Sequence, residues 1–113
     1  MRTVKKAKLL RLHFGESDRY HGQPLYEAIV HRCKELKIAG ATVFRGLEGY
    51  GGTAEIHRHH LMRKDQPIVV TIVDTPENMA RLIPEVEAMM DTGMIATSDV
   101  EYMRIEKPPA AGD

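Results

Sequence analysis

Three histidines stand within four positions near the middle of the chain, at His57, His59 and His60. Imidazole suits zinc, copper or nickel, and in an extended segment His57 and His59 share one face. Two ligands do not complete a metal site, and the neighbouring arginines and lysine would repel a cation. Solvated loop side chains, or a basic surface that contacts an anion or a partner, explain the cluster better than a metal centre.

Four glycines precede these histidines in the stretch RGLEGYGG, which runs from Arg45 to Gly52. Glycine lacks a Cβ and admits positive φ, so its backbone amides can approach an anion closely. The stretch matches neither of the two common phosphate-binding patterns, GxxxxGK[ST] and GxGxxG. It predicts either a hinge at the base of a long loop or a hinge that also forms one wall of a ligand site.

The other reactive side chains have structural explanations. Cys33 lies on an apolar helical stripe without an obvious histidine partner, which favours a buried small side chain over a nucleophile. Acid–base chemistry is conceivable for the ionisable group around the first predicted loop, but capping and ion pairs between subunits account for that group better. The group comprises His13, Glu16, Asp18, Arg19 and His21.

Composition limits the kinds of partner. The 113 residues fit one domain, and 16 Lys and Arg balance 16 Asp and Glu, so no global field attracts nucleic acid or an anionic membrane. The apolar run IVVTIV also lacks the aromatic side chains on which RNA-recognition sheets stack bases. We therefore expect no nucleic-acid partner.

Sequence features at the start of the chain and the single cysteine bear on localisation. Arg11 and His13 interrupt the first apolar run before a signal-peptide core or a membrane span could form. With only Cys33, no intramolecular disulfide is possible and nothing indicates an oxidising compartment. We expect a cytoplasmic protein without direct membrane insertion.

Hydrophobic periodicity predicts four strands and two helices. Leu10, Leu12 and Phe14 alternate with Arg11 and His13, as in a half-buried strand, and IVVTIV is typical of a central strand buried on both faces. The predicted strands cover residues 7–14, 41–47, 67–74 and 94–105, and the predicted helices run from Pro24 to the region of Ile38 to Gly40 and from Pro76 to Met90.

The second helix carries both a start signal and a breaker. Thr75 can cap its N-terminus, with Pro76 at the first helical position. Pro84 lies inside the apolar stripe of the same helix, which predicts a kink or a break there.

The order β-α-β-β-α-β is that of an α+β, ferredoxin-like sandwich, an antiparallel sheet with two helices on one face. We expect a single domain over residues 1–106 with a long loop near 49–66, followed by a flexible tail over 107–113. The second sheet face has no covering layer, and oligomerisation is the natural way to bury it.

The run from Gly15 to Gly51, above all GATVFRGLEGYG, resembles the PII-like family catalogued as domain-of-unknown-function number 190, and the similarity continues through IVDTPE and DVEYMRI. That family is related to the PII signal transducers and to the copper-tolerance CutA proteins. The resemblance implies a ferredoxin-like homotrimer with its sheets around a threefold axis. It also implies that a long loop contacts partner proteins and that adenine nucleotides bind in clefts between subunits.

The phosphate-holding segments of PII proteins are changed in this chain. The segment DTGMI, Asp91 to Ile95, retains Gly93 but has Met94 where a lysine would help. After the last strand, MRIEK keeps Arg104 and Lys107 as phosphate contacts implied by the resemblance. A nucleoside monophosphate or a cyclic nucleotide therefore suits the site better than a triphosphate.

The resulting hypothesis is a PII-like regulatory protein that binds a small phosphorylated effector, an adenine nucleotide first of all, and controls an unidentified protein partner, a transporter being one candidate. We expect no enzymatic activity and no firmly bound cofactor. One alternative is a CutA-like divalent-metal protein that uses the loop histidines, and a second is a small phosphate-ester or anhydride hydrolase. The candidate ligand-binding residues are Arg45, Gly46, Glu48, Gly49, Gly51, Gly93 and Arg104.

Overall fold

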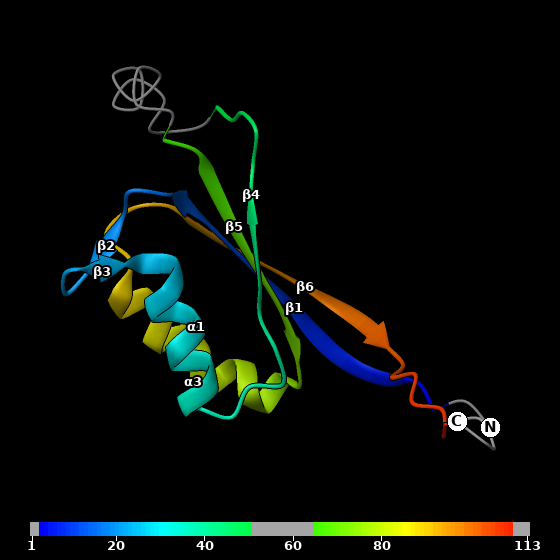
Figure 1. Ribbon diagram of the computed structural model, residues 1–113. Helices are drawn as coiled ribbons and strands as arrows, with labels where there is room; N and C mark the ends of the chain where they lie inside the picture. The colour runs from blue at the N-terminus through cyan, green and yellow to red at the C-terminus, as the bar shows by residue number, and fades with distance from the viewer. Residues whose placement is uncertain (1–2, 51–64, 110–113) are drawn as a thin grey trace.

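The computed structural model describes residues 3–50 and 65–109, which form a four-stranded antiparallel sheet with two helices packed on one face (Figure 1). The sheet contains β1 (Lys5–Gly15), β4 (Thr42–Arg45), β5 (Pro67–Asp74) and β6 (Met94–Tyr102), and the helices are α1 (Leu25–Glu35) and α3 (Pro76–Met89). The strand order is β4-β5-β1-β6, so the first strand of the chain lies inside the sheet. This arrangement confirms the predicted α+β, ferredoxin-like fold.

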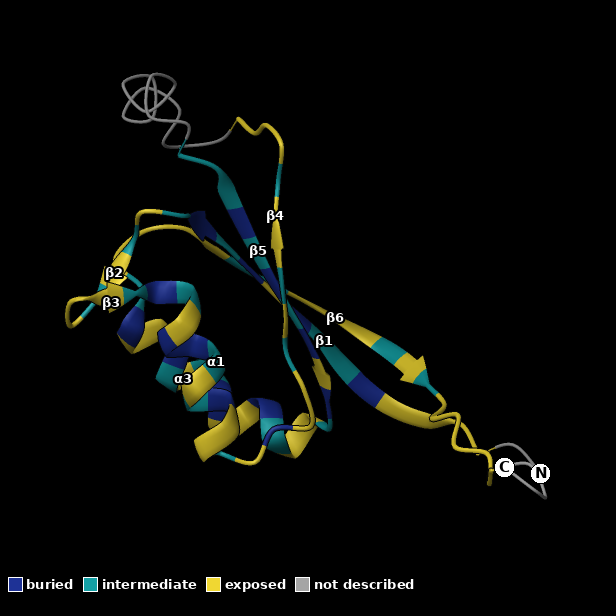
Figure 2. Cartoon of the chain, in the orientation of Figure 1, coloured by how far each residue is buried: buried dark blue, intermediate teal, exposed yellow. Residues whose placement is uncertain are grey.

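The core lies between the helices and the sheet. Alternate residues of β1, Leu10, Leu12 and Phe14, are buried, as the period of two predicts. Full burial of one such side chain stabilises the fold by roughly 1.5–3 kcal/mol. The helices complete the core with Leu25, Ala28, Ile29, Cys33, Met79, Leu82, Val86 and Met89, and the buried stripes face the sheet in Figure 2.

The opposite face of the sheet is not covered by any described part of the chain. The strand register places Phe44, Val69, His13 and Met94 side by side in one row across it. Phe44 is 52% exposed and Met94 54% exposed. The sequence predicted that IVVTIV is buried on both faces. Within one chain it is buried on the helix side only, since Val73, on the uncovered face, is 38% exposed.

The helix α1 ends earlier than predicted. It stops at Glu35, and Lys37 has a φ of 59°, in the left-handed region. The amide of Ile38 donates to the carbonyl of Cys33 at 2.9 Å, and that of Lys37 donates to Lys34 at 3.1 Å, the two bonds of a Schellman motif. A lysine therefore ends the helix where glycine is usual, which explains why the expected end at Ile38 to Gly40 was wrong. At the other end, Pro24 is the N-cap residue and not the first helical residue.

The start of α3 confirms the capping prediction, whereas of the predicted kink or break at Pro84 the break is absent. The Thr75 side chain accepts a hydrogen bond from the amide of Asn78 at 3.1 Å, and Pro76 opens the helix. The helix continues through Pro84 to Met89. Proline has no N–H, so the carbonyl of Ala80, four residues earlier, receives no helical hydrogen bond from Pro84. Both residues are exposed, and water can donate to this carbonyl instead.

A small hairpin between β1 and α1 was not predicted. Its strands, β2 (Arg19–Tyr20) and β3 (Gln23–Pro24), pair antiparallel through a two-residue turn. Both turn residues have positive φ, 50° at His21 and 83° at Gly22, as a type I′ turn requires. The strands β4 and β6 are also shorter than expected, and β6 ends at Tyr102 instead of Ile105.

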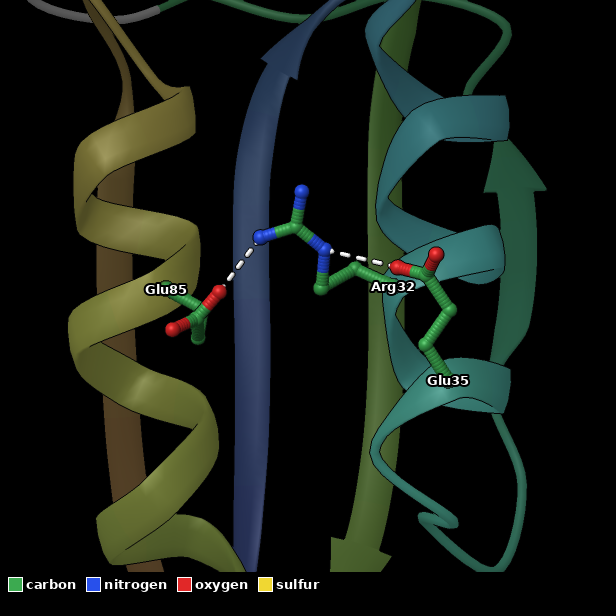
Figure 3. A network of polar contacts seen from close by, with 3 residues as sticks. All are labelled: Arg32, Glu35 and Glu85. Atoms are coloured by element: carbon green, nitrogen blue, oxygen red, sulfur yellow. Dashed lines mark hydrogen bonds and ion pairs between the residues drawn. The ribbon is translucent and has the colours of Figure 1, made fainter.

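The two helices are joined by an ion-pair network around Arg32 (Figure 3). The guanidinium of Arg32, on α1, donates to Glu85 on α3 and, at 2.9 Å, to Glu35 on its own helix. The Arg32 side chain is 29% exposed and that of Glu85 41% exposed, so solvent screens the pair only in part.

Replacing Arg32 with methionine keeps the aliphatic stem and removes both ion pairs. We expect the free energy of unfolding to fall by about 0.5–1 kcal/mol, measured by urea denaturation. The control Glu35→Gln breaks only the pair within α1 and is expected to cost about 0.3 kcal/mol. Equal losses in the two variants would show that the link from α1 to α3 contributes nothing.

Candidate functional site

The candidate ligand-binding residues fall at two opposite ends of the sheet. Gly15, Arg45, Pro67 and Met94 mark one end, where β1 and β4 finish and β5 and β6 begin. We call this the loop end. It gathers five of the seven candidates, while Gly51 and the three histidines of the alternative metal site lie outside the described residues. The five are Arg45, Gly46, Glu48, Gly49 and Gly93.

Two glycines at the loop end let the chain pass close to the start of β5. A Cβ at Gly46 would lie 2.8 Å from the Cγ of Pro67, and one at Gly49 would lie 3.1 Å from the same atom. The amide of Gly46 donates to the Pro67 carbonyl at 2.7 Å. Close packing against Pro67 thus accounts for both glycines, independently of any ligand.

Gly93 is required by the turn between α3 and β6. Its φ is 120°, and a Cβ there would lie 2.3 Å from the carbonyl oxygen of His13. The turn consequently passes directly beside the end of β1, and only glycine allows that approach.

Four side chains hold the loop end together, and we call Glu16, Ser17, Arg45 and Asp65 the loop clasp. Arg45 donates to the carboxylate of Glu16. Asp65 accepts from the amide of Ser17 at 2.8 Å and from its hydroxyl at 3.1 Å. The clasp joins the turn after β1 to the two roots of the segment between β4 and β5.

Backbone bonds reinforce the clasp. The amide of Glu16 donates to the Gln66 carbonyl at 2.9 Å. With its amide nitrogen turned toward the two carbonyls, the Gln66 side chain donates to Gly46 and Leu47, both at 2.9 Å. The Arg45 side chain is nonetheless 59% exposed and accessible to a ligand.

Arg104 lies at the other end of the sheet, which we call the arm end. The strands β1 and β6 extend together beyond the helices, and the two ends of the described chain lie there (Figure 1). Because β1 has 11 residues, the arm end is about 33 Å from the loop end at roughly 3.3 Å per residue. A single chain therefore does not bring Arg104 to the other candidates.

The arm end has its own basic hollow. Its volume is about 790 Å³, and its lining includes the cations Lys5, Arg104 and Lys107. Within the described residues none of these three cations forms an ion pair. The hollow can therefore offer positive charge to an anion. Lys5 was missed by the sequence reasoning, although pairing of the first and last strands in the predicted topology places it beside the end of β6.

The ionisable group of the first loop does not converge on one site. Glu16 pairs with Arg45, the Asp18 carboxylate accepts from the Gly15 amide at 3.3 Å, and the His21 ring stacks on Tyr20 with centroids 4.0 Å apart. His13 points to the uncovered sheet face, in the row with Met94. Structural roles thus account for most of this group, although the ion pair of Glu16 lies within one chain and not between subunits as expected.

Neither a thiol nor a metal cluster is found as an active centre in the described parts of the chain. Burial raises the pKa of the Cys33 thiol to about 11, so it stays protonated at neutral pH. No three of the described His, Cys, Asp and Glu side chains lie close enough together to hold a metal ion. The described helices are also too short or too polar to cross a membrane.

Comparison with solved structures shows that the fold is that of the PII-like proteins. A structure of CPII, a nitrogen regulatory PII-like protein from Thiomonas intermedia K12 bound to ADP, AMP and bicarbonate, matches with a TM-score of 0.64 at 12% identity, covering 88% of this chain and 98% of that one. CPII bound to ADP, AMP and acetate matches with a TM-score of 0.61 at 18% identity, covering 90% and 93% of the two chains.

The chain belongs to the DUF190 family, described as "Uncharacterized ACR", whose model matches residues 7–102. A UPF0166 protein from Aquifex aeolicus is 43% identical over 105 residues, which cover 91% of this chain and 98% of that protein. The family identified from GATVFRGLEGYG is confirmed.

Proposed function

We propose that this protein is a homotrimeric PII-like regulator that binds an adenine nucleotide at a site shared by two neighbouring subunits, without catalysing a reaction. The observation that carries the proposal is the separation of the loop end from the arm end. Each end supplies part of an anion site, Arg45 at one and Lys5, Arg104 and Lys107 at the other. Both parts can act on one ligand only if a neighbour contributes its arm end.

A cyclic assembly meets this requirement. In a ring with head-to-tail contacts, every loop end faces the arm end of the next subunit, and all sites are equivalent. The uncovered sheet face, with Phe44, Val73 and Met94 exposed, would be buried in such an assembly. The CPII structures with ADP and AMP support an adenine nucleotide as the ligand, because they share this fold.

Regulation would follow from the position of the loop end. A ligand there contacts both roots of the segment between β4 and β5, and it would favour one arrangement of those roots. An unidentified protein partner, with a transporter as one candidate, would bind the two arrangements with different affinities.

Mixing two inactive variants tests the shared site. We expect Arg45→Ala and Arg104→Ala each to weaken ADP binding by about tenfold or more in titration calorimetry, since each removes a charged phosphate contact. When the two variants are unfolded together and refolded as an equal mixture, about one quarter of the sites regain both arginines. That fraction should bind ADP with wild-type affinity.

Two results would contradict the proposal. Wild-type affinity in both single variants would remove the arginines from the site, and no recovery in the mixture would place the whole site in one chain. Chromatography of the ADP after long incubation checks the expected lack of catalysis, because a hydrolase would convert it to AMP and phosphate.

A further inference from the structure

We propose that the loop clasp is the phosphate-binding part of the nucleotide site and that Glu16 and Asp65 occupy its hydrogen-bond donors in place of the ligand. A phosphate that binds there displaces both carboxylates and so loosens the second root, at Asp65, of the segment between β4 and β5. This inference rests on the proposed function and assigns an autoinhibitory contact to the same site.

The donors of the clasp are those that proteins use for phosphate. The Arg45 guanidinium, and the amide and hydroxyl of Ser17, all donate to a carboxylate oxygen. Guanidinium, backbone N–H and serine hydroxyl groups bind phosphate oxygens with the same geometry. The two carboxylates therefore act as internal analogues of the ligand.

The two sets of clasp bonds also meet on one turn. Glu16 and Ser17 are adjacent on the turn after β1, so the bond from Arg45 and the bonds from Ser17 meet at neighbouring residues. The loop end also contains the turn at Gly93, which passes beside His13 at the end of β1. A phosphate at this place would lie at the end of the sheet that gathers five of the candidates.

Displacement is energetically feasible because the clasp is exposed. The Arg45 side chain is 59% exposed and that of Glu16 is 29% exposed. Ion pairs of this kind contribute little to stability, since water screens their charges and ordering two long side chains costs entropy. A phosphate carries more charge than one carboxylate and has more acceptor oxygens, so it can compete for the same donors.

The exchange would be transmitted directly to the segment between β4 and β5. Arg45 lies at its first root and Asp65 at its second, and both are attached through the same turn. When the ligand takes the donors, the tie from Asp65 to Ser17 is lost, whereas Arg45 stays linked to the turn through the phosphate. The backbone bonds from Glu16 to Gln66 and from Gly46 to Pro67 remain. The second root thus becomes freer without separation of the strands.

Substitutions that weaken the clasp test the inference. We expect Glu16→Gln and Asp65→Asn to bind ADP about two- to fivefold more tightly than the wild type in titration calorimetry, because less of the protein is held in the competing state. Glu16→Asp is the matched control for charge. It keeps the negative charge but is one methylene shorter, so it loses reach toward Arg45 and should also bind more tightly.

Hydrogen exchange provides an independent readout. We expect the Ser17 amide to remain protected at saturating ADP, because the phosphate replaces Asp65 as the acceptor of its N–H. The amide of Glu16 donates to Gln66 at the second root, and it should exchange faster, because this bond opens more often once Asp65 no longer ties the root to Ser17.

The outcomes separate the two proposals. Tighter binding in all three variants supports the clasp, as does binding that occurs only in the variants. Tighter binding in Glu16→Gln and Asp65→Asn but not in Glu16→Asp indicates simple charge repulsion and overturns the clasp. If the wild type binds ADP and the variants bind it equally or more weakly, the clasp is overturned while the proposed function stands. If neither wild type nor variants bind ADP, the proposed function fails and the clasp fails with it.

Discussion

Replacement of Gly93 with alanine is expected to lower the free energy of unfolding by about 3 kcal/mol, because two effects act together. A φ of 120° is accessible to glycine and strained for any other residue. The new Cβ would also lie 2.3 Å from the carbonyl oxygen of His13, so the backbone of β1 or of the turn must shift. The measurement is urea denaturation at one fixed protein concentration.

Gly40→Ala is the matched control for this experiment. A Cβ at Gly40 would meet no atom within 4 Å, and the φ of this residue is not positive. Alanine should therefore change stability there by less than about 1 kcal/mol, with any gain arising from the less flexible unfolded chain. Similar effects of the two substitutions would show that the turn beside His13 relaxes freely. In that case Gly93 would have to be explained by a ligand instead of by packing.

The second large effect is expected at Asp74, the only buried charged residue among those that the structure describes. Its carboxylate accepts from the amides of Ala39 at 2.8 Å and Thr75 at 2.7 Å and from the side chain of Asn78 at 2.9 Å. The bonds tie the turn after α1 and the start of α3 to the end of β5. Asn has the same shape as Asp but turns an N–H₂ group toward a donor. We therefore expect Asp74→Asn to lower the free energy of unfolding by about 2–3 kcal/mol.

The effect of Asp74 should also depend on pH. Burial raises the pKa of this carboxyl, but the hydrogen bonds from Ala39, Thr75 and Asn78 and the charge of Arg81 outweigh burial, and the net pKa is below its usual value. Its contribution is therefore fully present above the unfolded-state pKa of about 3.9 and is lost as pH falls through the folded-state pKa.

The stability difference between wild type and Asp74→Asn should accordingly be constant near neutral pH and shrink below about pH 4. Urea denaturation over a series of pH values measures it. Asp99→Asn is the control, because the hydrogen bond from Lys8 at 2.7 Å also lowers the pKa of Asp99, but the Asp99 side chain is 84% exposed. If Asp99→Asn lowered the free energy of unfolding as much as Asp74→Asn does, the role assigned to burial would be contradicted.

The fold was predictable because its strongest local signals are consistent with one another. IVVTIV, with Pro67 before it and Asp74 after it, predicted β5 with the bounds that the structure has, and Thr75 with Pro76 predicted the start of α3. The end of α1 was not predictable in this way, since a lysine at a left-handed position has no sequence signal of its own. The hairpin of β2 and β3 was missed because strands of two residues have no measurable periodicity.

The site was less accessible to sequence reasoning because it depends on relations between distant segments. Gly93 and Arg104 are close in sequence, yet they flank the nine residues of β6 and lie at opposite ends of the sheet. A predicted strand between them already implied this separation. Contacts such as Ser17 with Asp65 join turns that no local pattern connects, so the loop clasp could be found only from the structure.

The interior position of β1 determines when the molecule can fold during synthesis. β1 is made before the other strands of the sheet, but its neighbours are β5 and β6, which leave the ribosome much later. Leu10, Leu12 and Phe14 must remain uncovered in the nascent chain until then, together with both unpaired edges of β1. Such non-local pairing slows folding and prolongs exposure to aggregation, so completion of the sheet is a late step that follows synthesis of β6.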